Sequence, residues 1–166
     1  VAGLSYEEQL AVEGTMGYVD DVTIELGVEA ELPESYVRQQ AERLRLYREL
    51  DSLRDEKALV AFGERLVDRF GEMPEAARQL LDVVRLRWEA MRLGMEKVKV
   101  KNGLMIVQFV GDDSSPFYKS DAFMTLLKKV TKEPDRYVLK QRERKLGMTV
   151  RRVADVSEAL RVLKSL

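Results

Sequence analysis

The chain has 166 residues, of which 45% are hydrophobic and 34% charged, so it can bury a core beneath a heavily charged surface. It contains no cysteine and no histidine, which excludes disulfides, thiolate zinc sites and imidazole metal ligands. A chain without cysteine fits a reducing cytosol, and we therefore expect a cytoplasmic protein. No apolar run approaches the roughly 20 residues that span a bilayer, and the first ten residues lack the features of a signal peptide, so we expect no membrane contact.

The net charge of −1 conceals a strong asymmetry along the chain. Residues 1–36 hold nine acidic side chains and no lysine or arginine, so the rest of the chain carries a net charge of +8. Such a distribution can serve nucleic-acid binding, an intramolecular contact or solubility alone.

The first 20 residues predict a connecting segment. A pattern from Tyr6 to Val12 indicates the end of a helix, and glycines break the link that follows it. A single domain is then expected over residues 21–166. Its first element is a short strand over 22–26, where apolar residues alternate with polar ones, and Pro33 lies beyond its end because proline cannot continue a ladder.

Three helices are expected next, each with signals at its ends. Ser35 is the candidate cap of the first helix. Asp55 can begin the second, and Gly71 can stop it in the left-handed conformation. The third begins at Pro74, a favoured first-turn residue, and ends at Gly94. We predict these helices over 35–50, 55–70 and 74–94.

After Gly94 the pattern changes to strands. Valine and lysine alternate from Glu96, and Asn102-Gly103 is a strong signal for a hairpin turn. The order of elements contains no repeated βαβ unit, which favours an α+β fold with a segment of about three helices plus a small, mostly antiparallel sheet and two further helices. The remaining elements are predicted as a strand over 104–110, a helix over 117–130, a second hairpin of strands 137–141 and 146–153 around a charged turn, and a last helix capped by Asp155 or Ser157.

The chain lacks the residues and motifs on which catalysis usually depends. Nucleophile–base pairs usually need histidine, and neither a G-x-x-x-x-G-K-[ST] nor a G-x-G-x-x-G phosphate loop occurs. Asp112-Asp113 is the nearest approach to a metal-binding pair, but serines and a proline follow it, as is typical of a turn. We therefore expect no catalytic, cofactor-binding or metal-binding residue, and no enzyme activity in this chain.

The C-terminal half suggests a nucleic-acid-binding module as an alternative function. Residues 96–152 contain 14 basic and 7 acidic side chains, and a sheet with a lysine face can hold phosphates. The lysines of KVKVK also have a plain explanation, because they occupy the solvent side of an amphipathic strand, where lysine also discourages edge pairing. Aromatic residues that would stack on bases do not interleave with them.

The corner between the second and third helices holds the most specific candidate site. Asp68 and Arg69 fall in the last turn of a helix, where the helix dipole favours arginine but disfavours a carboxylate. Asp68 therefore requires a compensating charge, which Arg65, a neighbouring helix or another domain can supply. One interpretation is a local structural ion pair. The other is that Asp68 and Arg69, with Glu64 and Arg65 one turn back, bind charges on a partner.

The sequence around this corner resembles the C-terminal domain of the bacterial transcription-repair coupling factors, the Mfd family. The resemblance is dense over about residues 22–95 and depends on several motifs together. The position before LVDRFG is often acidic in the family, whereas here it is Arg65 with Glu64 beside it. The matching residues are Leu32, Pro33, Tyr36, Arg43, Leu44, Leu46, Tyr47, Arg48, Asp68, Arg69, Phe70, Gly71, Met73, Pro74, Leu80, Leu81, Arg85, Leu86, Arg87, Leu93 and Gly94.

The resemblance implies a non-catalytic regulatory domain at the end of a much larger protein. Residues 1–20 would then be the remainder of a connection from a preceding motor region. The family protein is an ATP-driven DNA translocase that displaces stalled RNA polymerase and recruits UvrA, with ATP and magnesium bound by the motor. The domain would pack on an N-terminal module related to UvrB, mask the surface that binds UvrA and restrain the motor. Asp68 and Arg69 would lie in the part of the domain that meets this module.

Overall fold

The computed structural model describes residues 18–166, which form two compact units. One unit combines the described residues up to Gly27 with Leu86–Leu166, and the other comprises Val28–Arg85. Helix α4 (Glu75–Arg92) contributes its first part to the second unit and its end to the first. The helix predicted from Tyr6 to Val12 lies outside the described residues.

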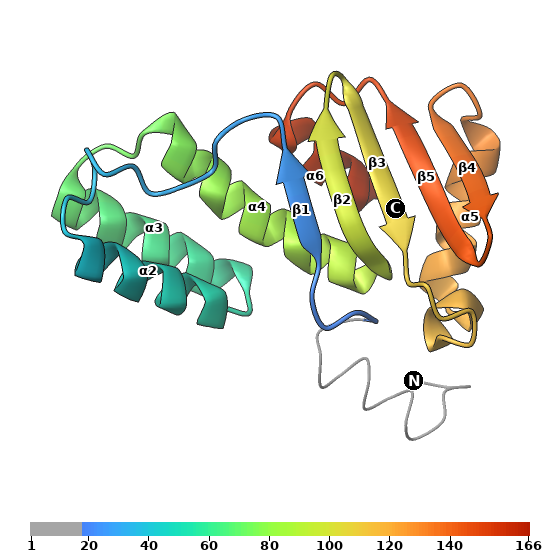
Figure 1. Ribbon diagram of the computed structural model, residues 1–166, viewed down its shortest axis with the longest axis horizontal. Coiled ribbons are helices and arrows are strands. Elements are labelled where there is room, and N and C mark those ends of the chain that lie inside the picture. Colours follow the sequence, from blue (N-terminus) through green and yellow to red (C-terminus); the bar gives the residue numbers. More distant parts are fainter. Residues whose placement is uncertain (1–17) are drawn as a thin grey trace. The chain divides into compact units, whose positions relative to one another are not determined.

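The first unit is built on a five-stranded sheet with the order β1-β2-β3-β5-β4 (Figure 1). Strand β1 pairs parallel with β2, and the other neighbours pair antiparallel. Because β1 pairs with the outer side of β2, the lysine-rich strand β2 is not an edge strand. Its lysines therefore do not protect a sheet edge. The strands are β1 (Thr23–Leu26), β2 (Met95–Lys101), β3 (Leu104–Phe109), β4 (Tyr137–Arg142) and β5 (Lys145–Arg151).

Both predicted hairpins are confirmed. Asn102 and Gly103 have φ values of 56° and 76°, as a tight turn with two left-handed central residues requires. The second hairpin turns at Glu143, whose φ is 55°.

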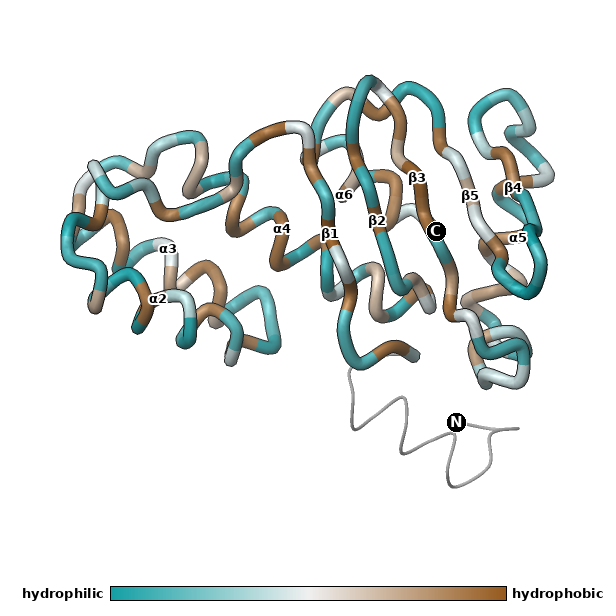
Figure 2. Tube along the Cα trace, in the orientation of Figure 1, coloured by the Kyte–Doolittle hydropathy of each residue, from teal (hydrophilic) through white to brown (hydrophobic). Residues whose placement is uncertain are grey.

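Helices cover one face of this sheet (Figure 1). The sheet side chains on that face, among them Val98, Val107 and Val150, form one buried cluster with residues of α5, α6 and the end of α4. Valine and lysine alternate along β2, which Figure 2 shows as alternating hydrophobic and hydrophilic residues, so the lysines lie on the other face. The helical elements are α5 (Asp121–Lys132), α6 (Val156–Ser165) and the short 3₁₀ helix η1 (Pro116–Lys119).

The second unit is helical and has its own core. It consists of α2 (Gln40–Ser52), α3 (Glu56–Phe70) and the first part of α4. Asp55 caps α3 as predicted, because its carboxylate accepts a hydrogen bond from the Ala58 N–H at 2.8 Å. Gly71 ends this helix as predicted, with a positive φ of 90°, but its ψ of −168° lies outside the left-handed helical region that was expected. The buried side chains include Val37, Leu46, Leu50, Leu59, Phe62, Leu66, Ala77 and Leu81.

Two predicted helix starts were wrong by several residues. The first helix begins at Gln40 rather than Ser35, because residues after Pro33 form a separate turn in which the Val37 N–H donates to the Pro33 carbonyl. The Arg43 guanidinium then donates to the Val37 carbonyl at 2.6 Å, a tertiary contact that fixes the turn. Helix α5 likewise begins at Asp121, after η1.

The predicted order of elements and the α+β class are confirmed by the five helices and five mostly antiparallel strands within residues 18–166. Among those residues, no helix is long and apolar enough to cross a membrane.

A candidate docking groove on the helical unit

Two of the sequence motifs meet at the predicted corner. The Tyr36 hydroxyl donates a hydrogen bond of 2.8 Å to the carbonyl of Gly71, and its ring lies 5.7 Å from that of Phe70. The Tyr47 hydroxyl accepts a 2.8 Å hydrogen bond from the Leu32 N–H. These tyrosines tie the chain before α2 to the middle of α2 and to the end of α3, so the motif residues hold the corner in a fixed shape.

Arg65 and Arg69 contribute to the same framework. Arg69 forms an ion pair of 2.6 Å with Glu42 on α2, and its guanidinium also lies 4.9 Å from the centre of the Phe70 ring. Arg65, one turn earlier on α3, forms an ion pair with Glu49 on α2. Both arginines therefore link α2 to α3.

Glu64 and Asp68 lie on a different side of α3. They line a shallow groove of about 390 Å³ together with Val60 and Val67 of the same helix. The two valines are 44% and 43% exposed, so they add apolar surface to the groove. Residues 60, 64, 67 and 68 recur at helical spacing and form one stripe. Of the four predicted site residues, the structure thus brings Glu64 and Asp68 together in the groove and places the two arginines outside it.

The opposite wall of the groove comes from the α3–α4 turn and from α4. Met73 and Leu81 supply apolar surface, and Arg85 lies at one end. Gly63 leaves room at the floor, since a Cβ there would lie 3.3 Å from the Leu81 side chain. These residues all belong to the helical unit.

Arg85 does not neutralise the acidic residues of the groove. It forms ion pairs of 2.9 Å with Glu56 and with Asp82, and the hydrogen bond to Glu56 is the main cause of the raised pKa of Arg85. Within residues 18–166, the carboxylates of Glu64 and Asp68 have no hydrogen bond or ion pair. The groove therefore offers exposed apolar surface beside two uncompensated negative charges. Such a surface fits a partner that carries apolar and basic side chains together.

Val60 and Val67 were missed as candidate site residues. In the sequence, valines at helical spacing are typical of a buried face. Their position in one stripe with Glu64 and Asp68 is the sequence signal that could have identified them. The core stripe of α3 is a different one and contains Leu59, Phe62 and Leu66.

Within the described part of the chain, no group of three or more potential metal-ligating side chains is close enough to hold a metal ion. Asp112 accepts hydrogen bonds from the N–H and the hydroxyl of Ser114, at 2.9 and 2.6 Å, and these bonds lower its pKa. This geometry is that of an Asx turn.

The fold and the groove together define an α+β domain with a candidate protein-docking surface. The family model for the TRCF domain matches residues 26–120, and the chain belongs to this family. The resemblance recognised in the motifs is therefore confirmed.

The curated relatives are named transcription-repair-coupling factors. The chain is 34% identical to the protein of Escherichia coli (strain K12) over 86 residues, and 28% identical to that of Rickettsia bellii over 109 residues. These matches cover 52% and 62% of this chain but only 8% and 10% of the two relatives. The chain thus spans about a tenth of the length of the relatives that it matches.

A solved structure has the same fold. The C-terminal domain of a transcription-repair coupling factor superposes with a TM-score of 0.69 over 87% of this chain and 92% of that domain, at 16% sequence identity. At 16% sequence identity, this similarity shows a shared fold alone.

Proposed function

We propose that this chain is the non-catalytic C-terminal regulatory domain of a transcription-repair coupling factor, and that the α3 groove docks it onto the N-terminal, UvrB-related module of the same protein. Docking masks the surface that binds UvrA and restrains the motor. The parent protein is an ATP-dependent DNA translocase in the cytoplasm that displaces stalled RNA polymerase and recruits UvrA. ATP and magnesium act in its motor, while this domain requires no cofactor.

One observation carries the docking proposal. Two exposed valines and two unpaired carboxylates lie in one groove on a helix whose end is fixed by Tyr36, Arg65 and Arg69. A surface on a rigid element loses little conformational entropy on binding.

The character of the groove also fits a reversible contact. The groove is shallow and partly charged, and interfaces of modest area with charged contacts are typical of transient association. A masking domain must release its partner surface, so a large apolar interface would be unsuitable.

The test is a calorimetric titration of the chain into the isolated N-terminal module. Asp68→Arg and Glu64→Lys introduce positive charge into the groove and should weaken binding at least tenfold, since like charges across an interface cost several kcal/mol. Glu72→Arg is the matched control, because Glu72 is exposed near the same corner but does not line the groove. It should bind like the unchanged chain.

If Glu72→Arg weakens binding as much as Asp68→Arg does, the contact lies outside the groove. If Asp68→Arg unfolds the helical unit, the carboxylate is structural and the assignment of this residue fails.

A further inference from the structure

We infer that the uncovered face of the sheet binds the phosphate backbone of double-stranded nucleic acid without reading its sequence. This surface lies in the sheet unit and is separate from the groove on α3. The inference therefore goes beyond the proposed docking function and does not depend on it.

The surface consists of the side chains that alternate away from the helices. The cross-strand register places Lys99, Ile106 and Thr149 in one row across β2, β3 and β5. A neighbouring row contains Lys97, Gln108 and Gly147. Among the described residues of this unit, no helix lies over this face (Figure 1). The central strip is a hollow of about 560 Å³, in which Ile106 is 45% exposed and Gly147 contributes no side chain.

Basic side chains border this strip on both sides. Lys97, Lys99 and Lys101 project from β2 on one side, and Lys140 and Arg142 of β4 lie on the other. Lys145 on β5 stands directly opposite Arg142. Acidic side chains also lie near this face among the described residues. Glu25 forms an ion pair of 3.1 Å with Lys97, Glu143 lies in the β4–β5 turn, and the Glu96 carboxylate lies near Gly111, as the Lys145 side chain does.

Most of these positive charges are uncompensated. Within residues 18–166, no ion pair or hydrogen bond joins the side chains of Lys99, Lys101, Lys140, Arg142 or Lys145 to another group. Like charges directly opposite in a sheet, such as Arg142 and Lys145, destabilise it, as do lysines repeated on the same side of one strand. A polyanion held against the sheet would offset this repulsion.

One structural reason for lysine on a strand, protection of a sheet edge, does not apply to β2. Lysine protects exposed sheet edges from pairing with other chains, but the edge of β2 is covered by β1. Within residues 18–166, Lys99 and Lys101 have no ion pair, so they are available to bind an anion.

The geometry favours a duplex over a single strand. None of the described strand residues on this face is aromatic, since Phe109 and Tyr137 are buried in the core, so the strands offer unpaired bases no stacking platform. Strands β2 and β4 are three strand spacings apart, or about 14 Å. This separation is close to the width of the major groove of about 12 Å, so the two basic columns can contact the two phosphate strands that border a groove.

The test measures the binding of a fluorescently labelled 20-base-pair DNA duplex to the 166-residue chain by anisotropy, over a series of salt concentrations. We expect affinity that falls as salt rises, because bound phosphates release counterions. The double variant Lys101→Glu with Lys140→Glu removes one contact from each column. It should weaken binding about tenfold or more at low salt, and the slope of log K against log salt should fall by roughly two.

The matched control is Lys128→Glu with Lys132→Glu. These exposed lysines lie on α5, on the helix-covered side, and produce the same change of net charge. The control should change the affinity less than about twofold. Lys140→Glu alone, measured beside Lys128→Glu, repeats the comparison if the first double variant does not fold.

Three results would overturn the inference. One is the absence of duplex binding at low salt. Another is an equal loss of affinity in both double variants, which would show attraction by net charge alone. The third is stronger binding of polyglutamate than of DNA at equal charge concentration, which would assign the face to an acidic protein.

Discussion

Asp68 and Arg69 are neighbours in the chain but serve different surfaces of α3. The Arg69 guanidinium lies 2.6 Å from the Glu42 carboxylate on α2, while Asp68 lines the groove with Val67. The local ion pair that one interpretation expected for Asp68 is not formed among the described residues; Arg69 pairs with Glu42 instead, so only Asp68 of the two stays available to a partner. Substitutions of Arg69 should therefore affect the stability of the fold, whereas substitutions of Asp68 should affect docking.

We expect Arg69→Ala to lower the free energy of unfolding by about 1 kcal/mol. It removes a partly exposed ion pair and a contact between a cation and the Phe70 ring, each of which contributes about 0.5–1 kcal/mol. Asp68→Ala should change the stability by less than about 0.5 kcal/mol, since a carboxylate near a helix C-terminus is unfavourable. Urea unfolding followed by circular dichroism measures both. A larger loss for Asp68→Ala than for Arg69→Ala would contradict this division of roles.

The two motif tyrosines should differ in their effect on stability. Tyr36→Phe removes a hydrogen bond to an exposed carbonyl and should cost about 0.5–1.5 kcal/mol. Tyr47→Phe removes the acceptor of the N–H of Leu32, a buried residue, and should cost about 1–3 kcal/mol, because a buried donor is left unsatisfied. Thermal unfolding of the two variants shows which of them loses more stability, and we expect the larger loss for Tyr47→Phe.

The first helix shows why its start could not be predicted from sequence. Ser35 has the right chemistry for a cap, but the turn after Pro33 is fixed by Arg43 and Tyr36 through contacts with residues 37 and 71. Such contacts exist only in the folded chain. The hairpin at Asn102-Gly103 was predictable because its turn depends on the conformational freedom of those two residues themselves.

The candidate site was predictable only in part for a similar reason. The charges of Glu64 and Asp68, together with the family motif, predict a site at the corner. The groove itself depends on which side of α3 remains uncovered, and valines 60 and 67 look like core residues in the sequence.

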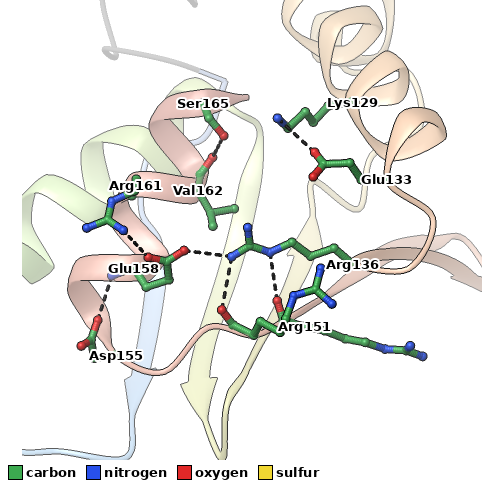
Figure 3. A network of polar contacts seen from close by, with 10 residues as sticks. Lys129, Glu133, Arg136, Arg151, Asp155, Glu158, Arg161, Val162 and Ser165 are labelled. Carbon is green, nitrogen blue, oxygen red and sulfur yellow. Dashed lines mark hydrogen bonds and ion pairs between the residues drawn. The ribbon is translucent and has the colours of Figure 1, made fainter.

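Arg136 connects the last helix to the second hairpin (Figure 3). Its guanidinium donates to the carbonyls of Arg151 and Arg152, at 3.0 and 3.2 Å, and to the Glu158 carboxylate at 2.9 Å. We expect Arg136→Ala to destabilise the sheet unit by about 2 kcal/mol, since hydrogen bonds of charged groups contribute about 1.5–3 kcal/mol each and are not additive.

Arg161→Ala is the matched comparison for Arg136→Ala. Arg161 binds the same carboxylate at 2.7 Å, but its side chain is 76% exposed, against 20% for Arg136. Its loss should cost less than about 0.5 kcal/mol. Equal losses in chemical unfolding would show that the carbonyl contacts of Arg136 contribute nothing.

Two glycines with positive φ should respond differently to alanine. Gly94 has a φ of +66°, and a Cβ there would lie 2.5 Å from the Phe117 ring. Gly103 has a φ of +76° with open space around it. Gly103→Ala should cost about 1–2 kcal/mol for the backbone alone, and Gly94→Ala about 3 kcal/mol or more because overpacking is added. Similar melting temperatures for the two variants would contradict the close packing of Phe117.

The central claim is that the α3 groove meets the N-terminal module, and site-specific crosslinking tests it most directly. The chain has no cysteine, so Val67→Cys and Leu44→Cys each provide one attachment site for a photoreactive maleimide. Val67 lines the groove and is 43% exposed, whereas Leu44 is 50% exposed and lies on α2, outside the groove. The account predicts a crosslink to the isolated module from position 67 and none from position 44. A crosslink from position 44 alone, under conditions where the module binds, would contradict it.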